Sequence, residues 1–306
     1  MVAIKTNHLS KSFYNKTVVD NISLTVNNGE IYGFLGRNGA GKSTFINMIT
    51  GIMLPTSGSF YLLDKDQKLD TVKKKIGVLP DYSTFYDSMT PFDHLSYFCK
   101  VSGFKVSKKK INETLELVGL SNDREKKVGK FSFGMKKKLG IAQAIINDPD
   151  LIFLDEPTSG VDAESAIQIK NLIISLQKTG KTIFMTSHNL NEIENVCTRV
   201  AIMKDGKIQS EGTIQELKNK YKSTKTVKIR IQEHISESTK KDIEKFLENN
   251  SKDYNWEKSY LIIDIDNQNF IPIILRLLMK MSIDIFEVIT LEPSLEEIFL
   301  DKNIAI

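Results

Sequence analysis

The feature that most constrains the fold is a glycine-rich segment that directly follows a short apolar run, Ile31–Leu35. The segment has the pattern glycine, four residues, then Gly-Lys-Ser, and it reads, in order, Gly36, Arg37, Asn38, Gly39, Ala40, Gly41, Lys42, Ser43 and Thr44. Such glycines let backbone N–H groups converge on phosphates, and a helix that begins after them adds the positive end of its dipole. The pattern therefore predicts a phosphate-binding loop between a strand and a helix. In it, Lys42 is expected to reach the β- and γ-phosphates of a nucleotide, and the Ser43 hydroxyl to ligate Mg²⁺.

A second motif is an apolar run that ends in two acids. Leu151–Leu154 is typical of a buried strand and is followed directly by Asp155 and Glu156. Open α/β sheets carry their chemistry at the carboxyl ends of strands, so these acids are expected beside the phosphate loop. Asp155 is expected to hold Mg²⁺, directly or through water, and Glu156 to act as the general base toward water. The alternative is that the acids only cap the next helix, and the phosphate loop makes that the weaker reading.

Strand-like pieces and turn signals alternate in the first part of the chain. Strands are predicted, in order, at residues 3–6, 22–26 and 31–35. Asn27-Asn28-Gly29 predicts a hairpin turn between the last two of them.

A helical pattern then covers residues 91–147 and predicts a helical insertion. Strands at 151–154 and 182–185, with a helix at 163–178 between them, have the order of a parallel sheet. Asp205-Gly206 predicts a closing hairpin between strands at 200–203 and 207–209.

The polar stretch Lys218–Lys225 is typical of a linker and predicts a domain boundary near Tyr221. After it, period-two strand patterns and helical patterns follow in the order of a split βαβ, ferredoxin-like module. Ser294 and Glu297 form a capping-box pattern that predicts one last helix. The two predicted domains cover residues 1–221 and 222–306, as expected for a chain of 306 residues.

Composition disfavours several classes of function. The net charge of +4 is too small for a surface that coats nucleic acid, and the basic residues are nearly all lysine, which disfavours bidentate reading of bases. Cys99 and Cys197 lie far apart in sequence, and residues 1–10 lack an apolar signal core, so we expect free thiols in a reducing cytosolic setting. The most apolar stretch, residues 270–281, is interrupted by proline, arginine and lysine, so no membrane span is expected.

With these motifs in this order, residues 1–220 or so resemble the nucleotide-binding subunits of ABC transporters. The resemblance implies an α/β fold with a P-loop NTPase (RecA-like) core, an N-terminal antiparallel β subdomain and a helical subdomain at about 91–147. The small C-terminal domain is expected to be α+β and ferredoxin-like. The tail Leu291–Leu300 is similar to the ending of the exporter branch of the family, and a dimer-stabilising or regulatory role is expected for the C-terminal domain.

In this family a signature segment lies between the two phosphate motifs, and Phe131–Met135 occupies its place. Ser132 and Gly134 match the family pattern Leu-Ser-Gly-Gly-Gln, while Phe133 and Met135 depart from it. The resemblance implies that Ser132 and the backbone around Gly134 bind the γ-phosphate held by a second subunit. The lysines that follow, Lys136, Lys137 and Lys138, are expected to form a solvated helix face. The variant is similar to that of drug, antibiotic and peptide exporters with a separate permease.

Other matches are to single positions. Phe13 stands where the family stacks an aromatic ring on adenine, with Val18 near the ribose, although aromatics in a strand can equally fill a core. Asp162 lies in the segment that resembles the loop coupling the two active sites. His188 stands where the switch histidine of the family contacts the γ-phosphate and the catalytic carboxylate, here Glu156.

The clearest departure is Asp81, at the position where the family carries a glutamine that ligates Mg²⁺ and hinges toward the permease. Aspartate offers an oxygen but has a shorter reach and a negative charge, so we expect slower or more permease-dependent hydrolysis. The neighbouring positions Tyr82, Phe85 and Tyr86 are expected to face the permease, with ordinary loop packing as the alternative.

The resemblance implies an ATPase that uses ATP and Mg²⁺, pairs with a second copy or a related subunit, and drives export through a separate permease at the cytoplasmic face of the membrane. No nucleic-acid partner is expected. The alternative is a soluble ABC ATPase of translation or DNA maintenance. A P-loop kinase or GTPase is disfavoured because no Asn-Lys-x-Asp motif is present. The cargo stays open.

Overall fold

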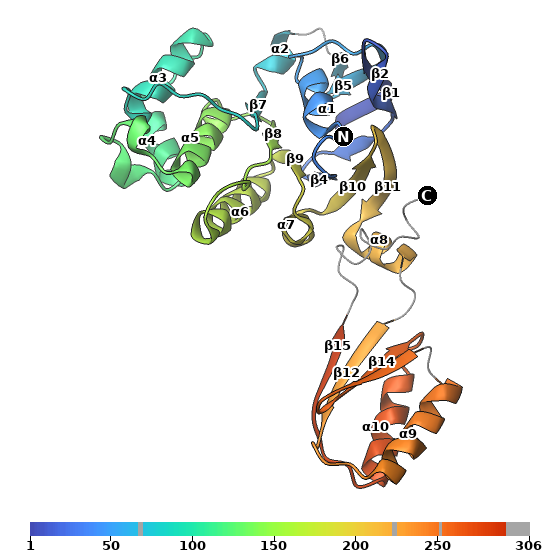
Figure 1. Ribbon diagram of the computed structural model, residues 1–306. Coiled ribbons are helices and arrows are strands. Elements are labelled where there is room, and N and C mark those ends of the chain that lie inside the picture. The colour runs from blue at the N-terminus through green and yellow to red at the C-terminus, as the bar shows by residue number, and fades with distance from the viewer. Residues whose placement is uncertain (67–69, 222–224, 251–252, 292–306) are drawn as a thin grey trace. The chain divides into compact units, whose positions relative to one another are not determined.

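The computed structural model describes residues 1–66, 70–221, 225–250 and 253–291 (Figure 1). Contacts divide the chain into two compact units, Met1–Ile214 and Gln215–Ile306. The expected boundary, residue 221, is the last residue of helix α8 (Ile214–Tyr221). The first unit carries every residue that the sequence analysis assigns to the nucleotide site.

A six-stranded sheet carries the strands that precede the predicted site, in the spatial order β11, β10, β4, β9, β8, β7. The strands are β4 (Ile31–Leu35), β7 (Ile76–Leu79), β8 (Leu151–Asp155), β9 (Thr182–Ser187), β10 (Arg199–Lys204) and β11 (Lys207–Thr213). All neighbours are parallel except β10 and β11, which form the predicted closing hairpin. Because β4, β9 and β8 are adjacent and parallel, the residues that follow them meet at one edge of the sheet.

Helices cover both faces of this sheet. Phe34 of β4 packs against Phe45 of α1 (Lys42–Ile49), with ring centroids 4.9 Å apart. A side chain at Gly33, on the opposite face, would collide with Ile193 of α7 (Leu190–Val196). Successive residues of a strand point to opposite faces, so α1 and α7 lie on opposite sides of β4. Helix α6 (Ala163–Lys178) links β8 to β9, as predicted.

A second sheet of the first unit is antiparallel, with the order β2-β1-β5-β6 and β3 paired with β1. Its strands are β1 (Val2–Phe13), β2 (Lys16–Ile22), β3 (Thr25–Asn27), β5 (Ser57–Leu62) and β6 (Lys65–Asp66). Helix α2 (Asp70–Lys73) follows β6. This sheet is the N-terminal antiparallel subdomain that the resemblance implies.

The predicted hairpin at Asn27-Asn28-Gly29 is wrong. β3 pairs with β1, whereas β4 lies between β9 and β10, so the turn connects two different sheets. All residues of β4 are buried, which fits the centre of a parallel sheet covered on both faces. A local turn signal does not reveal which strands the chain pairs with on either side of it.

The helical segment consists of α3 (Pro91–Val101), α4 (Lys108–Leu117) and α5 (Phe133–Ile145), with short 3₁₀ turns at Ser121–Asp123 and Val128–Lys130. Helix α5 packs closely on β7. Glycine at position 77 allows this approach, since a side chain there would lie 2.0 Å from the carbonyl oxygen of Ala144. Figure 1 shows α3, α4 and α5 grouped on one side of β7 and β8, with α1 on the other side.

The second unit has the predicted ferredoxin-like fold. Its elements are α8, β12 (Lys225–Ile231), α9 (Glu237–Asn250), β13 (Asp253–Glu257), β14 (Tyr260–Ile265), α10 (Phe270–Lys280) and β15 (Ile285–Leu291). The strands form an antiparallel sheet in the order β13-β14-β12-β15. Its core joins Ile229 and Ile263 of the sheet with Leu247 and Leu278 of the helices. The last helix predicted from Ser294 lies outside the described residues.

Among the described helices, none combines the length and the apolar character that crossing a membrane requires. Cys99 and Cys197 are free and buried, and burial raises the pKa of both thiols.

Candidate active site

The glycine-rich loop joins β4 to α1, as the sequence pattern predicts. Gly39 and Gly41 have φ angles of 85° and 109°, in the left-handed region that glycine adopts without strain. A side chain at Gly41 would also lie 2.6 Å from the carbonyl oxygen of Val18 on β2. Glycine at this position therefore lets the loop pass close to β2 and begin α1 at Lys42, so the first amides of the helix are at the end of β4.

Lys42 is buried, and its ammonium folds back over the loop. Nζ donates to the carbonyl oxygen of Gly36 at 2.7 Å and lies 3.3 Å from Oε1 of Glu156. Phosphate oxygens are stronger acceptors for an ammonium than a neutral carbonyl is. Lys42 can therefore exchange the carbonyl for a phosphate that binds the loop.

Glu156 follows β8 and is the centre of the site. Its backbone has a φ of 50°, unusual for a residue other than glycine, and its N–H donates to the Thr186 hydroxyl at 3.0 Å. Oε2 lies 2.8 Å from Nδ1 of His188, and Oε1 faces Lys42. The carboxylate is thus held between an ammonium and an imidazole, in an arrangement suited to a general base.

Asp155, the preceding residue, is buried at the end of β8. Burial raises the pKa of its carboxyl group, and hydrogen bonds from the hydroxyls of Thr186 and Ser43 oppose that rise in pKa. The atoms near Asp155 that could bind a metal ion are oxygens, which is the ligand type that Mg²⁺ prefers. A cation bound there would stabilise the charged carboxylate. No three His, Cys, Asp or Glu side chains among the described residues form a ready-made metal cluster, so phosphate oxygens would complete the coordination.

The expected solvated face at Lys136, Lys137 and Lys138 is wrong for two of the three residues. Lys137 and Lys138 are 5% and 8% exposed, because α5 packs against β7 and β8 and also against α6, where Lys138 donates to Gln168. Lys137 Nζ donates to the backbone carbonyl oxygens of Asp81 at 2.9 Å and of Glu156 at 3.0 Å. Three consecutive lysines carry no periodicity, so the sequence does not distinguish the inward from the outward positions.

The residues of the signature segment form a second group, apart from the group around Glu156. The Ser132 hydroxyl caps α5 and accepts from the N–H of Met135 at 3.2 Å. A side chain at Gly134 would lie 2.5 Å from the Ser165 hydroxyl, and the ring of Phe133 lies against Gly160. Asp162 caps α6 by accepting from the N–H and the hydroxyl of Ser165, and these bonds lower the pKa of Asp162.

The structure therefore brings the predicted residues into two groups. Lys42, Ser43, Asp155, Glu156 and His188 lie together at the carboxyl edge of the parallel sheet. The signature residues and the 160–162 turn lie together at the beginnings of α5 and α6. In Figure 1, α5 and the helix α1 that follows the phosphate loop are on different sides of β7 and β8.

The structure shows Val18 beside the phosphate loop and Phe13 at the end of β1. The backbone carbonyl of Val18 faces Gly41, as described above. Phe13 is the last residue of β1 and is 40% exposed, with the ammonium of Lys11 5.2 Å from the centre of its ring. An exposed ring is available for stacking, which disfavours the alternative that Phe13 fills the core.

Glu192 is a buried acid that the sequence analysis missed. It accepts from the hydroxyls of Thr158 at 2.5 Å and of Ser187 at 2.8 Å. It therefore ties the turn after Glu156 to the strand end before His188. A signal was present, since Asn189 caps α7 and accepts from the N–H of Glu192, but a capping pattern alone does not indicate burial.

Replacing Glu192 with alanine is expected to lower the free energy of unfolding by about 2–4 kcal/mol, because a buried hydroxyl, Ser187, and a half-buried one, Thr158, lose their acceptor. Urea unfolding followed by circular dichroism measures the loss. Glu113→Ala is the control, since Glu113 pairs with Lys109 at 3.8 Å on the exposed surface and its loss is expected to change stability by less than about 0.5 kcal/mol. Equal effects of the two variants would contradict this role of Glu192.

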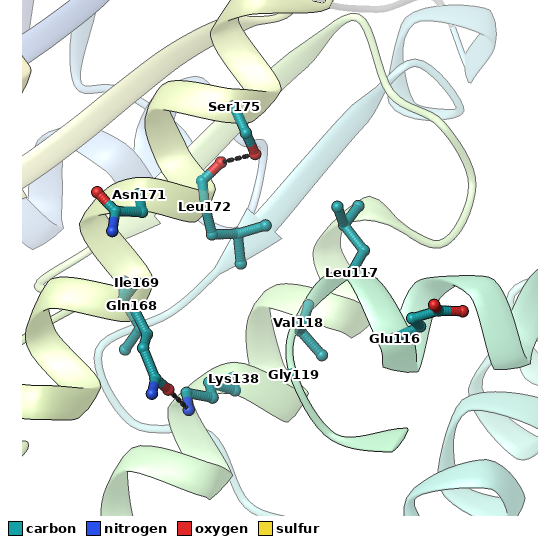
Figure 2. A pocket seen from close by; sticks show the side chains of 10 residues that line it. All are labelled: Glu116, Leu117, Val118, Gly119, Lys138, Gln168, Ile169, Asn171, Leu172 and Ser175. Atoms are coloured by element: carbon teal, nitrogen blue, oxygen red, sulfur yellow. Dashed lines mark hydrogen bonds between the residues drawn. The ribbon is translucent and has the colours of Figure 1, made fainter. Parts of the chain in front are cut away.

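A separate cavity of about 450 Å³ lies between α6 and the end of α4 (Figure 2). Leu117 and Leu172 line it on facing elements, and Lys138 donates to the side-chain oxygen of Gln168 at one end. None of the predicted site residues lines this cavity, so it is not part of the candidate active site.

Comparison with known proteins agrees with the geometry. The family pattern described as ABC transporter matches residues 19–159, and that of the ATP-binding protein DrrA1-3-like C-terminal domain matches residues 212–302. The bacitracin transport ATP-binding protein BcrA of Bacillus licheniformis is 40% identical over 220 residues, which are 71% of this chain and 72% of the relative. The linearmycin resistance ATP-binding protein LnrL of Bacillus subtilis (strain 168) is 31% identical over 307 residues, which are 97% of each chain.

Solved structures give the same result for the first part of the chain. An ATP-binding cassette of an ABC transporter in its ADP conformation has a TM-score of 0.64 at 26% identity, covering 71% of this chain and 92% of its own. A nucleotide-free ATP-binding cassette has a TM-score of 0.65 at 27% identity, covering 72% and 94%. The alternative of a factor for translation or DNA maintenance is not favoured by these relatives. The chain belongs to the ATP-binding subunits of ABC transporters, a family whose nucleotide-binding domain implies ATPase activity.

Proposed function

We propose that this chain hydrolyses Mg·ATP as one half of a pair of subunits and thereby drives export through a separate membrane permease. The observation that carries the proposal is the position of the Glu156 carboxylate, 3.3 Å from the Lys42 ammonium and 2.8 Å from the His188 ring. A carboxylate between a phosphate-binding cation and an imidazole is placed to activate water beside a bound γ-phosphate.

Each residue of this group has a distinct role in the proposed reaction. The loop amides and Lys42 bind the β- and γ-phosphates and stabilise charge that develops on them. Glu156 accepts a proton from the attacking water, and His188 holds the carboxylate in place through Nδ1. Mg²⁺, when held by Ser43 and Asp155, would neutralise part of the phosphate charge. Phe13 stacks on adenine, with Val18 beside the ribose.

The second group of residues serves the partner subunit. Ser132 and the N-terminus of α5 offer a hydroxyl and a positive dipole end to an anion. They lie away from the phosphate loop of their own chain, as Figure 1 shows for α5 and α1. Two copies arranged head to tail would each complete the site of the other, with Asp162 in the turn that couples the two sites.

The surface toward the permease includes the loop that follows β7. Tyr82 and Tyr86 are 88% and 54% exposed, and the Tyr86 ring packs edge-on against Tyr97 of α3 at 5.5 Å. Exposed aromatics of this kind are typical of interface anchors. Asp81 lies in the same loop, and Lys137 donates to the backbone carbonyls of both Asp81 and Glu156. A movement of the permease can therefore reach the hydrolytic site through this loop.

The relatives named for bacitracin transport and linearmycin resistance support an antimicrobial compound as the cargo. Loss of this chain from its host is expected to lower the concentration of bacitracin or linearmycin that stops growth, and the wild-type chain to restore it. Lys42→Ala is the matched control, because it lacks the phosphate-binding ammonium. Equal restoration by Lys42→Ala, or unchanged susceptibility without the chain, would contradict the proposal.

A further inference from the structure

Lys137 occupies an unusual position for a lysine. It lies on α5, five residues after Ser132, yet its side chain is only 5% exposed. Its ammonium contacts three oxygens from two separate segments: the backbone carbonyl of Asp81 at 2.9 Å, the backbone carbonyl of Glu156 at 3.0 Å and Oδ1 of Asp81 at 3.6 Å. Lys137 thus connects its own helix, α5, which begins at the signature, with the loop toward the permease and with the turn of the catalytic base.

A buried ammonium needs both hydrogen-bond acceptors and a countercharge. Burial lowers the pKa of Lys137, and Asp81, Asp155 and Glu156 oppose that fall in pKa, with Asp81 contributing the most. The Phe133 ring, 5.7 Å away, covers the ammonium from the direction of the signature. Asp81 is therefore the direct partner that makes a lysine acceptable here.

Lys137 in turn makes Asp81 acceptable. Without the ammonium, Asp81 would place a third, uncompensated carboxylate near Asp155 and Glu156. Like charges gathered in one site repel one another. An ammonium 3.6 Å from Oδ1 of Asp81 offsets that repulsion. The negative charge of Asp81 and the positive charge of Lys137 therefore compensate for each other.

We propose that Lys137 is a positioning residue for hydrolysis, which holds the Asp81 loop against the turn of Glu156 while Asp81 supplies its countercharge. The inference rests on the proposed function, since it assigns Glu156 as the base. Because Ser132 caps α5 and Lys137 lies on it, a shift of α5 upon binding the nucleotide of the partner is expected to move the Asp81 loop and the Glu156 turn together. The contact of Lys137 with the Glu156 carbonyl thereby couples the position of the signature helix to that of the general base.

The test uses Lys137→Met, which keeps an unbranched side chain but removes the ammonium. Turnover of the purified chain at saturating Mg·ATP is expected to fall about tenfold or more, while KM stays within about twofold, because phosphate binding does not involve Lys137. Adding Asp81→Asn removes the uncompensated carboxylate and is expected to recover at least about threefold of turnover over Lys137→Met alone. Thermal unfolding of each variant shows whether it is folded.

Lys136→Met is the matched control. Lys136 is the neighbouring lysine, its side chain is 35% exposed, and it forms a long ion pair of 3.8 Å with Asp87. The turnover of this variant is expected to equal that of the wild type. Lys137→Gln, with a neutral amide, repeats the comparison if Lys137→Met does not fold. A folded Lys137 variant with wild-type turnover overturns the positioning role of Lys137, and failure of Asp81→Asn to rescue Lys137→Met overturns the charge compensation between the two residues. A wild-type chain that neither binds nor hydrolyses ATP would instead contradict the proposed function.

Discussion

Replacing Glu156 with glutamine is expected to stop ATP turnover and to convert the chain from a monomer into a dimer when Mg·ATP is added. Glutamine has nearly the shape of glutamate but cannot accept a proton from water, and loss of a general base typically costs about a hundredfold or more in rate. Lys42 and the loop amides are unchanged, and loss of the carboxylate 3.3 Å from Lys42 removes a competitor for its ammonium. ATP binding should therefore be kept or strengthened.

The size of the Glu156→Gln variant in solution, measured by light scattering with and without Mg·ATP, checks this expectation. The double variant Lys42→Ala and Glu156→Gln is the control, and it is expected to stay monomeric because it cannot hold the phosphates. A Glu156→Gln chain that binds ATP but stays monomeric would show that Phe133 and Met135 leave the signature inadequate alone. The search would then turn to a related second subunit or to the permease as the element that assembles the pair.

Local motifs account for most of what the sequence predicts correctly. The order of strand, glycine-rich loop and helix at residues 31–49 could be predicted because glycine adopts the positive φ angles of the loop without strain and an apolar strand precedes it. The helix predicted at 163–178 has the same bounds as α6, because Asp162 caps its beginning and Gly180 adopts a positive φ just after its end. These signals act over a few residues, so one chain is enough to interpret them.

What the sequence could not predict depends on contacts between distant segments. The partner of β3 is β1 rather than β4, because burial of β4 on both faces outweighs the nearby turn signal. Lys137 is buried because Asp81, fifty-six residues earlier, provides a carboxylate and a carbonyl in the right place. Glu192 is buried for the same kind of reason, with Thr158 as its distant partner. A charged residue is usually exposed, so such pairs need the fold to be known.

Two defective variants of this chain are expected to restore activity to each other when mixed. Lys42→Ala disables the phosphate loop and Ser132→Arg disables the signature, so each variant alone should have almost no turnover. In a mixed pair, the intact loop of one subunit meets the intact signature of the other. With equal amounts, half of the pairs are mixed and each holds one complete site, which gives about a quarter of the wild-type number of sites.

The ATPase rate of the mixture, compared with each variant alone at the same total concentration, measures this recovery. It distinguishes sites shared between two chains from sites complete within one, because in the second case mixing leaves both variants inactive. The grouping of Ser132 with Gly160 and Asp162, apart from Lys42 and Glu156, favours the shared arrangement. A mixture of Lys42→Ala with the double variant Lys42→Ala and Ser132→Arg is the control and should stay inactive, since neither chain keeps a working phosphate loop.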